Sequence, residues 1–228
     1  TACSHCFETM SEESGVVCSV NPRAGREGEY VMAPAARVKR VFVIGGGPAG
    51  MEAAVTAAQR GHQVTLFEKG KELGDQLATT ALPPYKEELN QLHRFLVSQV
   101  ERNNVNIKLN AKATAEAIMG GEPDTVIVAT GASPIIPNIP GVEKPKVITA
   151  PDALRQPTAV GERVIVIGGG LVGCETAELL AQKGKKVTIL EMLGRIANDV
   201  GIMTRRFLLR RLREDGIRME SDIKIEEI

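Results

Sequence analysis

A segment with the pattern strand, glycine turn, helix and strand occurs twice in this sequence and limits the folds that the chain can adopt. The first copy, Val41 to Lys69, reads VFVIGGGPAGMEAAVTAAQRGHQVTLFEK, and the second, Val164 to Met192, reads VIVIGGGLVGCETAELLAQKGKKVTILEM. The two copies align without a gap, and about half of their positions are identical. An apolar run, a glycine turn, a helix of small residues and a second apolar run ending near an acid form the layout of a dinucleotide-binding βαβ unit.

The glycines of the first copy have separate physical roles. Gly45 can adopt the backbone conformation of a tight strand-to-helix turn, Gly47 lacks a Cβ that would hold a pyrophosphate away, and Gly50 lets helix and strand pack closely. The N–H groups that open the helix face the phosphates, and the helix dipole favours their negative charge. Glu68 is placed to hold a ribose diol. The predicted nucleotide-binding residues of this copy are Gly45, Gly47, Pro48, Ala49, Gly50, Glu68 and Lys69.

The second copy repeats the glycines and the acid of the first. Gly184 repeats Gly61, the predicted helix stop, and Glu191 repeats Glu68. Two ordinary strand–helix–strand units would need neither both glycine sets nor both acids, so we expect two nucleotides. The predicted nucleotide-binding residues of this copy are Gly168, Gly170, Leu171, Val172, Gly173 and Glu191.

Composition excludes some partners. The 228 residues are 43% hydrophobic and 25% charged, with 28 bases and 28 acids, so no overall field favours nucleic acid or an anionic membrane. No apolar run approaches the roughly 20 residues of a membrane span, and the N-terminus lacks a basic start and an apolar signal core. These observations predict a cytoplasmic protein with no membrane or nucleic-acid partner.

Three of the four cysteines lie in the first segment, which has little helix or strand periodicity. Close spacing of Cys3, Cys6 and Cys18 in a cytosolic chain indicates metal or redox chemistry rather than a disulfide framework. Three thiolates leave a four-ligand site one short. Structural zinc stays open as an alternative. The fourth, Cys174, is predicted to be a small buried residue within the second glycine-turn helix.

The remaining segments predict further elements of an α/β fold. Pro84 is suited to start a helix. A basic helix is expected from about Ile202 to Asp215, closed by Gly216, with its arginines on a solvated face. The apolar stripe of the helix after Pro84 is Leu89, Leu92, Leu96 and Val100. The expected strands are Ile107–Leu109, a buried strand Thr125–Ala129, and two short strands within Ile217–Ile228.

The motifs together resemble one family of flavoenzymes. CSVNPRAGRE from Cys18, VFVIGGGPAGMEAA, TVIVATGASPIIPNIPG and VIVIGGGLVGCETAELL are similar to the C-terminal half of the iron–sulfur flavoenzymes related to old yellow enzyme. That family includes 2-enoate reductase, 2,4-dienoyl-CoA reductase and the trimethylamine dehydrogenase group. The resemblance covers essentially the whole chain and implies two Rossmann-like lobes of the flavin and pyridine nucleotide oxidoreductase type.

The resemblance implies roles for individual residues. Cys3, Cys6 and Cys18 match the last three ligands of a 4Fe-4S cluster, and the first ligand would lie immediately before Thr1. Gln76 falls where relatives approach the flavin ring, and Thr130-Gly131 resembles the second flavin-domain signature. The implied domains are an iron–sulfur segment (1–36), an FAD- or ADP-binding domain (37–150) and an NAD(P)-binding domain (151–228), the whole being incomplete at both ends.

The resemblance also implies a function. NADH bound to the second copy would reduce FAD on the first, and electrons would pass through the cluster to FMN on a missing N-terminal TIM barrel, which would reduce an activated C=C bond of a small-molecule substrate. The parent enzyme would be a homo-oligomer. An open alternative is that the first copy holds only ADP and transfers no electrons, as in the trimethylamine dehydrogenase group.

Two local features refine this expectation. The disulfide reductases share both nucleotide units but place a redox cysteine pair soon after the first acid, and residues 70–84 contain no cysteine. A flavin–cluster route is therefore favoured over a flavin–disulfide route. Glu191 can accept hydrogen bonds from a ribose diol but would repel a 2′-phosphate, which favours NADH over NADPH, although Arg195 lies close enough in sequence to counter this preference.

Overall fold

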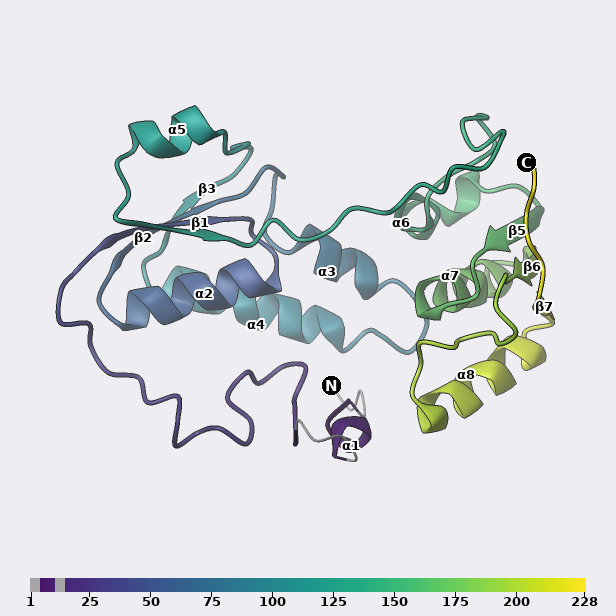
Figure 1. Cartoon of the computed structure of the whole chain (residues 1–228), viewed down its shortest axis with the longest axis horizontal. Coiled ribbons are helices and arrows are strands. Elements are labelled where there is room, and N and C mark those ends of the chain that lie inside the picture. The colour runs from purple at the N-terminus through teal and green to yellow at the C-terminus, as the bar shows by residue number, and fades with distance from the viewer. Residues whose placement is uncertain (1–4, 11–14) are drawn as a thin grey trace. The chain divides into compact units, whose positions relative to one another are not determined.

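The computed structural model describes residues 5–10 and 15–228 and divides the chain into two compact units (Figure 1). The first unit comprises residues 1–80 and 88–132, and the second comprises residues 81–87 and 133–228. The short segment 81–87 thus belongs to the second unit although the first surrounds it in sequence. The functional domains expected at 37–150 and 151–228 remain a prediction.

A parallel four-stranded sheet forms the centre of the first unit. It contains β1 (Arg40–Ile44), β2 (Gln63–Phe67), β3 (Asn106–Lys108) and β4 (Thr125–Val128), in the order β3-β2-β1-β4. The helices are α1 (His5–Thr9), α2 (Pro48–Gln59), α3 (Asp75–Thr80), α4 (Leu89–Arg102) and α5 (Ala115–Gly120). In Figure 1, α2 and α4 lie on one side of the sheet and α5 on the other.

The core of the first unit lies between the sheet and α2 with α4. Val43 and Leu66 from the sheet, Met51 and Ala54 from α2, and Val100 from α4 are all fully buried there. The small side chains of α2 let it approach the sheet closely, since most of that helix is Ala, Gly or Val. The predicted apolar stripe of α4 is confirmed as a packing face for Leu92, Leu96 and Val100.

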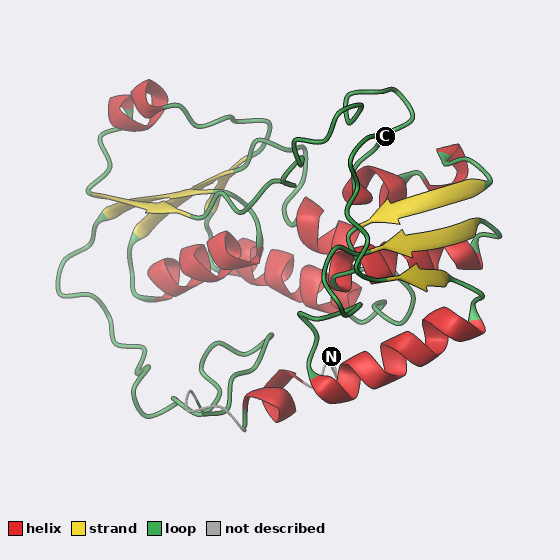
Figure 2. Ribbon diagram, turned by 45° about the vertical axis from the view of Figure 1, so that its right-hand side comes forward, coloured by secondary structure: helices red, strands yellow, loops and turns green. Residues whose placement is uncertain are grey.

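A parallel three-stranded sheet forms the centre of the second unit, and its arrows point the same way in Figure 2. It contains β5 (Arg163–Ile167), β6 (Lys186–Leu190) and β7 (Arg218–Glu220) in sequence order. The helices are α6 (Ala150–Arg155), α7 (Leu171–Gln182) and α8 (Ile202–Glu214), with a 3-10 turn η1 (Pro157–Ala159). Leu180, Ile189 and Leu212 are almost fully buried between these helices and the sheet.

The two sequence copies have the same strand register. Arg40 lies opposite Gln63 in the β1–β2 pair, and the corresponding Arg163 lies opposite Lys186 in the β5–β6 pair. Both pairs are parallel and are joined by a helix of equal length, α2 or α7. The predicted Rossmann-like α/β architecture is therefore confirmed.

Three predicted elements differ from the structure. The helix expected from Pro84 begins only at Leu89, because Tyr85 takes a left-handed φ of 65° that a helix cannot contain. β4 was expected to be buried, but it forms an edge of its sheet, where Val128 is 73% exposed. Of the two strands expected in residues 217–228, the structure shows only β7.

Among the described residues, no helix combines the length and the apolar character needed to cross a membrane. The longest helix, α4, has 14 residues. A span needs roughly 20 apolar residues.

Candidate nucleotide-binding sites

The first glycine turn joins β1 to α2 and leaves open space where a phosphate is expected. Gly45 has a φ of 110°, which side chains rarely adopt, and a Cβ on Gly50 would overlap the carbonyl oxygen of Gly45. Gly47 caps α2 in an extended conformation, and a Cβ built on it meets no atom within 4 Å. The turn therefore needs Gly45 and Gly50 for its own geometry, whereas the space beside Gly47 is free for a ligand.

The acid at the end of β2 is held by two backbone groups. Gly46 N–H donates to Oε2 of Glu68 at 2.7 Å, and Gly70 N–H donates to Oε1 at 2.7 Å. These bonds fix the half-buried carboxylate against the middle glycine of the turn. Each carboxylate oxygen keeps acceptor capacity for a ribose hydroxyl, so the predicted ribose role fits this geometry.

The second copy reproduces this arrangement atom for atom. Gly169 N–H donates to Oε2 of Glu191 at 2.7 Å, and Leu193 N–H donates to Oε1 at 2.7 Å. Gly168 has a φ of 102°, and a Cβ on Gly173 would overlap the carbonyl oxygen of Gly168. The duplication seen in sequence is thus also a duplication of hydrogen bonds.

Residues far apart in sequence meet beside the first turn. A Cβ on Gly45 would overlap the carbonyl oxygen of Ala129 and lie 3.1 Å from Cα of Thr130. A Cβ on Gly131 would lie 3.4 Å from Oε1 of Gln76. The structure therefore brings Gln76 and Thr130-Gly131 together at the carboxyl ends of β1 and β4, where ligands of open parallel sheets bind.

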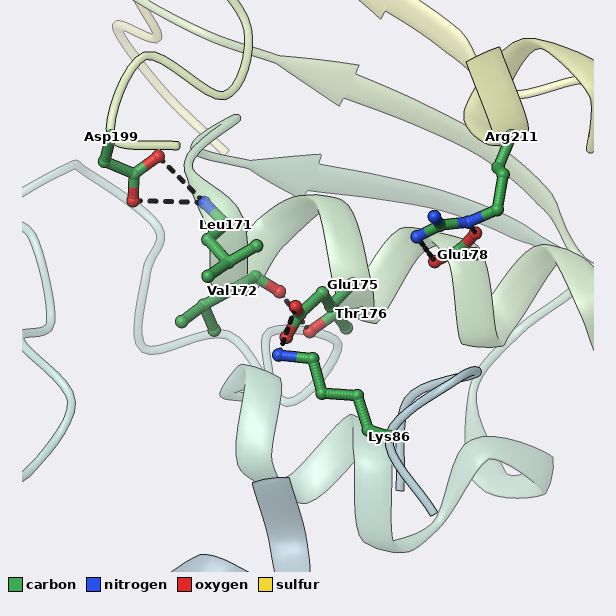
Figure 3. Close-up of polar contacts among 8 residues, drawn as sticks. All are labelled: Lys86, Leu171, Val172, Glu175, Thr176, Glu178, Asp199 and Arg211. Atoms are coloured by element: carbon green, nitrogen blue, oxygen red, sulfur yellow. Dashed lines mark hydrogen bonds and ion pairs between the residues drawn. The ribbon is translucent and has the colours of Figure 1, made fainter. Parts of the chain in front are cut away.

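In the part of the chain that the structure describes, the second turn has a contact that is absent from the first, drawn in Figure 3. Leu171, the first residue of α7, donates its backbone N–H to both carboxylate oxygens of Asp199, at 3.0 Å and 3.1 Å. Sequence reasoning did not single out Asp199. The signal was available, because the gap-free alignment of the two copies continues past Met192 and pairs Asp199 with Gln76.

The segment 81–87 is anchored to α7 and α8 of the second unit. Lys86 Nζ lies 2.6 Å from Oε1 of Glu175 on α7, and the Tyr85 ring lies 4.7 Å from the guanidinium carbon of Arg211 on α8 (Figure 3 draws the Lys86 pair). These contacts explain why Pro84 does not begin a helix. The chain there is bound to α7 and α8 before it returns to the first unit.

The prediction that the arginines of α8 lie on a solvated face is wrong for Arg211. This side chain is 30% exposed and donates from Nε and Nη2 to Glu178, whose carboxylate is fully buried on α7. The hydrogen bond with Glu178 raises the pKa of Arg211. The neighbouring Arg210 fits the prediction, because it forms an exposed pair with Glu214.

The cysteine segment is described only in part. Cys3 lies outside the described residues, Cys6 is exposed on α1 and Cys18 is half-buried. The buried Thr9 hydroxyl donates to the carbonyl of Cys6 at 3.3 Å and accepts from the N–H of Val17 at 3.2 Å. It thus ties the turn of Cys6 to the residue before Cys18. In residues 5–10 and 15–228, no three His, Cys, Asp or Glu side chains gather as a metal site.

Cys174 is buried, as predicted, and we expect it to be chemically inert. Burial, and next the charge of Asp199, raise the pKa of its thiol to about 12. At pH 8 only about one molecule in 10⁴ then carries the thiolate, the reactive form. Iodoacetamide labelling followed by peptide mapping should leave Cys174 unmodified in the native protein and modify it after denaturation. Rapid labelling of the native thiol would contradict this burial.

Known proteins that are similar to this chain in sequence or structure include oxidoreductases. A "NADH oxidase" of Thermoanaerobacter brockii is 45% identical over 216 residues, covering 92% of this chain and 33% of that protein. A "Cinnamate reductase" of Clostridium sporogenes is 46% identical over 187 residues, covering 82% of this chain and 28% of that protein. A solved 2-naphthoyl-CoA reductase complex matches with a TM-score of 0.94 and 35% identity, covering 100% of this chain and 35% of that one.

This chain therefore spans about a third of the length of the relatives that it matches. The matches confirm the resemblance to the C-terminal region of the flavoenzymes related to old yellow enzyme. The family model described as pyridine nucleotide-disulphide oxidoreductase matches residues 39–228 and takes in both glycine turns. The chain belongs to the pyridine nucleotide-disulphide oxidoreductase family.

Proposed function

We propose that this chain is the nucleotide-binding part of an NADH-dependent flavin reductase. FAD would bind at the first glycine turn, NADH at the second, and a 4Fe-4S cluster at Cys3, Cys6, Cys18 and one further cysteine. Electrons would continue to FMN on a TIM barrel, where an activated C=C bond of a small molecule is reduced. A cytoplasmic location and a homo-oligomeric parent enzyme belong to the same proposal.

The observation that carries the proposal is the repetition of the glycine turn and of its hydrogen-bonded acid. Two strand–helix junctions have the same register, the same positive-φ glycine and the same doubly bonded acid. Such a junction directs unpaired N–H groups and the positive end of a helix dipole toward one point. The family and the relatives named for reductase and NADH oxidase activities support the redox use of these sites.

The chain's own residues would bind and orient the nucleotides. When bound, NADH, FAD and the cluster supply hydride and electron transfer. Gly47 leaves room for the FAD pyrophosphate, while Ala49 and Gly50 offer N–H groups near the start of α2. Glu68 and Glu191, fixed by their backbone donors, would each accept from a ribose diol. Glu191 is 9% exposed as a residue, and its fixed carboxylate supports NADH over NADPH, because it would lie against a 2′-phosphate.

The proposed iron–sulfur cluster is supported by the two hydrogen bonds of the Thr9 hydroxyl, called here the Thr9 bridge. This bridge holds the chain near Cys6 and the chain near Cys18 together. Thiolates at short spacing suit both an iron–sulfur cluster and zinc. Anaerobically prepared full-length protein should contain iron and labile sulfide. Zinc without iron or sulfide would favour a structural zinc site instead.

A second candidate, ADP binding without electron transfer, is favoured by one observation. The Asp199 carboxylate lies at the second turn and accepts from the Leu171 N–H, which a dinucleotide would use. In that case the first unit would hold ADP, and no electrons would flow from a pyridine nucleotide.

The visible spectrum separates the two candidates. We expect purified full-length protein to carry a yellow chromophore that NADH bleaches under anaerobic conditions, with NADPH acting more weakly. Acid release of the bound nucleotide should yield FAD in addition to the FMN of the barrel. Release of ADP with no FAD, and no bleaching by NADH, would establish the second candidate and overturn the first.

A further inference from the structure

The carboxylate of Asp199 lies at the second glycine turn, beside Gly170 and the start of α7. Leu171 N–H is one of the groups at the start of α7 that have no acceptor within the helix, and it donates to Asp199 (Figure 3). A Cβ built on Gly170 would lie 3.1 Å from Oδ2 of Asp199. The space that Gly170 leaves for a phosphate is therefore held by a carboxylate of the same chain.

The first copy supplies an internal comparison. Gly74 N–H donates to the Gly46 carbonyl at 2.9 Å, and the aligned Ala197 N–H donates to the Gly169 carbonyl at 2.6 Å. Both donors have left-handed backbones, with φ of 74° and 53°. The loops that follow the two acids thus dock on the two turns in the same way, and the residue two positions later is Gln76 in the first copy and Asp199 in the second.

The carboxylate contact is specific to the second copy. Gln76 is neutral, and the residue aligned with Leu171 is Pro48, which has no N–H to donate. No atom lies within 4 Å of a Cβ on Gly47. The donor and the acceptor of this contact therefore both differ between the two copies, so the expected phosphate position is open in the first copy and filled in the second.

We infer that Asp199 sets the affinity of the second site for pyridine nucleotide, holding the phosphate position closed until the dinucleotide pyrophosphate displaces it. The inference rests on the proposed function of this site. A carboxylate and a pyrophosphate are both anions that need the same N–H groups of α7, so they repel each other if both remain. Nucleotide binding therefore includes the withdrawal of Asp199.

The local structure permits this withdrawal. Ala197 is fully buried and bonded to the turn, whereas Asn198 and Asp199 are exposed, and Gly201 follows directly before α8. The side chain of Asp199 can swing into solvent while Ala197 stays anchored. The core of the second unit remains packed during this movement.

Asp199→Asn is the sharpest test, because the amide oxygen can still accept from Leu171 N–H while the charge is removed. In full-length protein, calorimetric titration with NADH should show about tenfold tighter binding for Asp199→Asn than for the parent. The gain should shrink as salt screens the repulsion. Asp215→Asn is the matched control, since it removes a carboxylate that contacts Gln182 at the opposite end of α7 and should leave the NADH affinity unchanged.

Hydrogen exchange gives a second readout that does not depend on turnover. The Leu171 amide should exchange faster in Asp199→Ala than in the parent without nucleotide, and saturating NADH should restore slow exchange in both proteins. If the parent protein binds NADH and Asp199→Asn binds it equally or more weakly, the inference is overturned and the proposed function stays intact. Asp199 is then only a helix cap. Absence of NADH binding to parent and variant alike overturns both.

Discussion

Replacing Gly47 with alanine is expected to weaken flavin or ADP binding by about 100-fold and to leave the fold intact. This factor corresponds to about 2.7 kcal/mol of binding free energy. Gly47 has φ −72° and ψ 179°, which alanine adopts without strain, and a Cβ there meets no protein atom within 4 Å. The added methyl group would instead fill the space where the pyrophosphate approaches the start of α2. Flavin content after purification and the melting temperature of the protein without flavin measure the two effects separately.

Two further glycine variants make this test specific. Gly120→Ala places a methyl group in equally open space at the end of α5, so it should leave binding unchanged and should not lower the melting temperature, since alanine favours a helix more than glycine does. Gly50→Ala should lower stability as well as binding, because its Cβ would overlap the Gly45 carbonyl. If Gly47→Ala retains full flavin content, the first glycine turn is not the phosphate site.

Replacing Arg211 with methionine is expected to lower the free energy of unfolding by about 3 kcal/mol. The Glu178 carboxylate is fully buried on α7, and Arg211 supplies hydrogen bonds to both of its oxygens, at 2.6 Å and 3.2 Å. Removing the guanidinium leaves a buried charge unpaired, which costs more than the pair itself contributes. Urea unfolding of the protein, followed by far-ultraviolet circular dichroism, measures the change.

The neighbouring arginine provides the control for this prediction. Arg210→Met removes an exposed pair with Glu214, whose side chains are both 65% exposed, and should cost under about 1 kcal/mol. The double variant Glu178→Leu with Arg211→Met should recover most of the lost stability, because no unpaired charge remains. Equal effects of the Arg210 and Arg211 variants would show that the burial of Glu178 does not matter.

Local patterns predicted the repeated unit well. A tight turn, a close helix–strand approach and strand alternation depend on residues near one another in the chain, so the glycines and apolar runs indicated both βαβ units and their acids. The same patterns predicted α4 and α8 to within a few residues, except at Pro84. There the chain's local preference for a helix start is overridden by contacts of Tyr85 and Lys86 with residues about 90 or more positions later.

Short-range spacing in the sequence was enough to predict two nucleotide-type α/β units with paired glycines and paired acids, because each unit depends on residues near one another in the chain. How the acids are fixed, and which side chains meet at each turn, became visible in the folded structure. It showed that Glu178 is buried with Arg211, that Gln76 lies beside Gly131, and that Asp199 accepts a hydrogen bond from the Leu171 N–H at the second turn. Such contacts arise when helices and loops distant in sequence pack against one another, and the chemistry of one residue does not specify its partner.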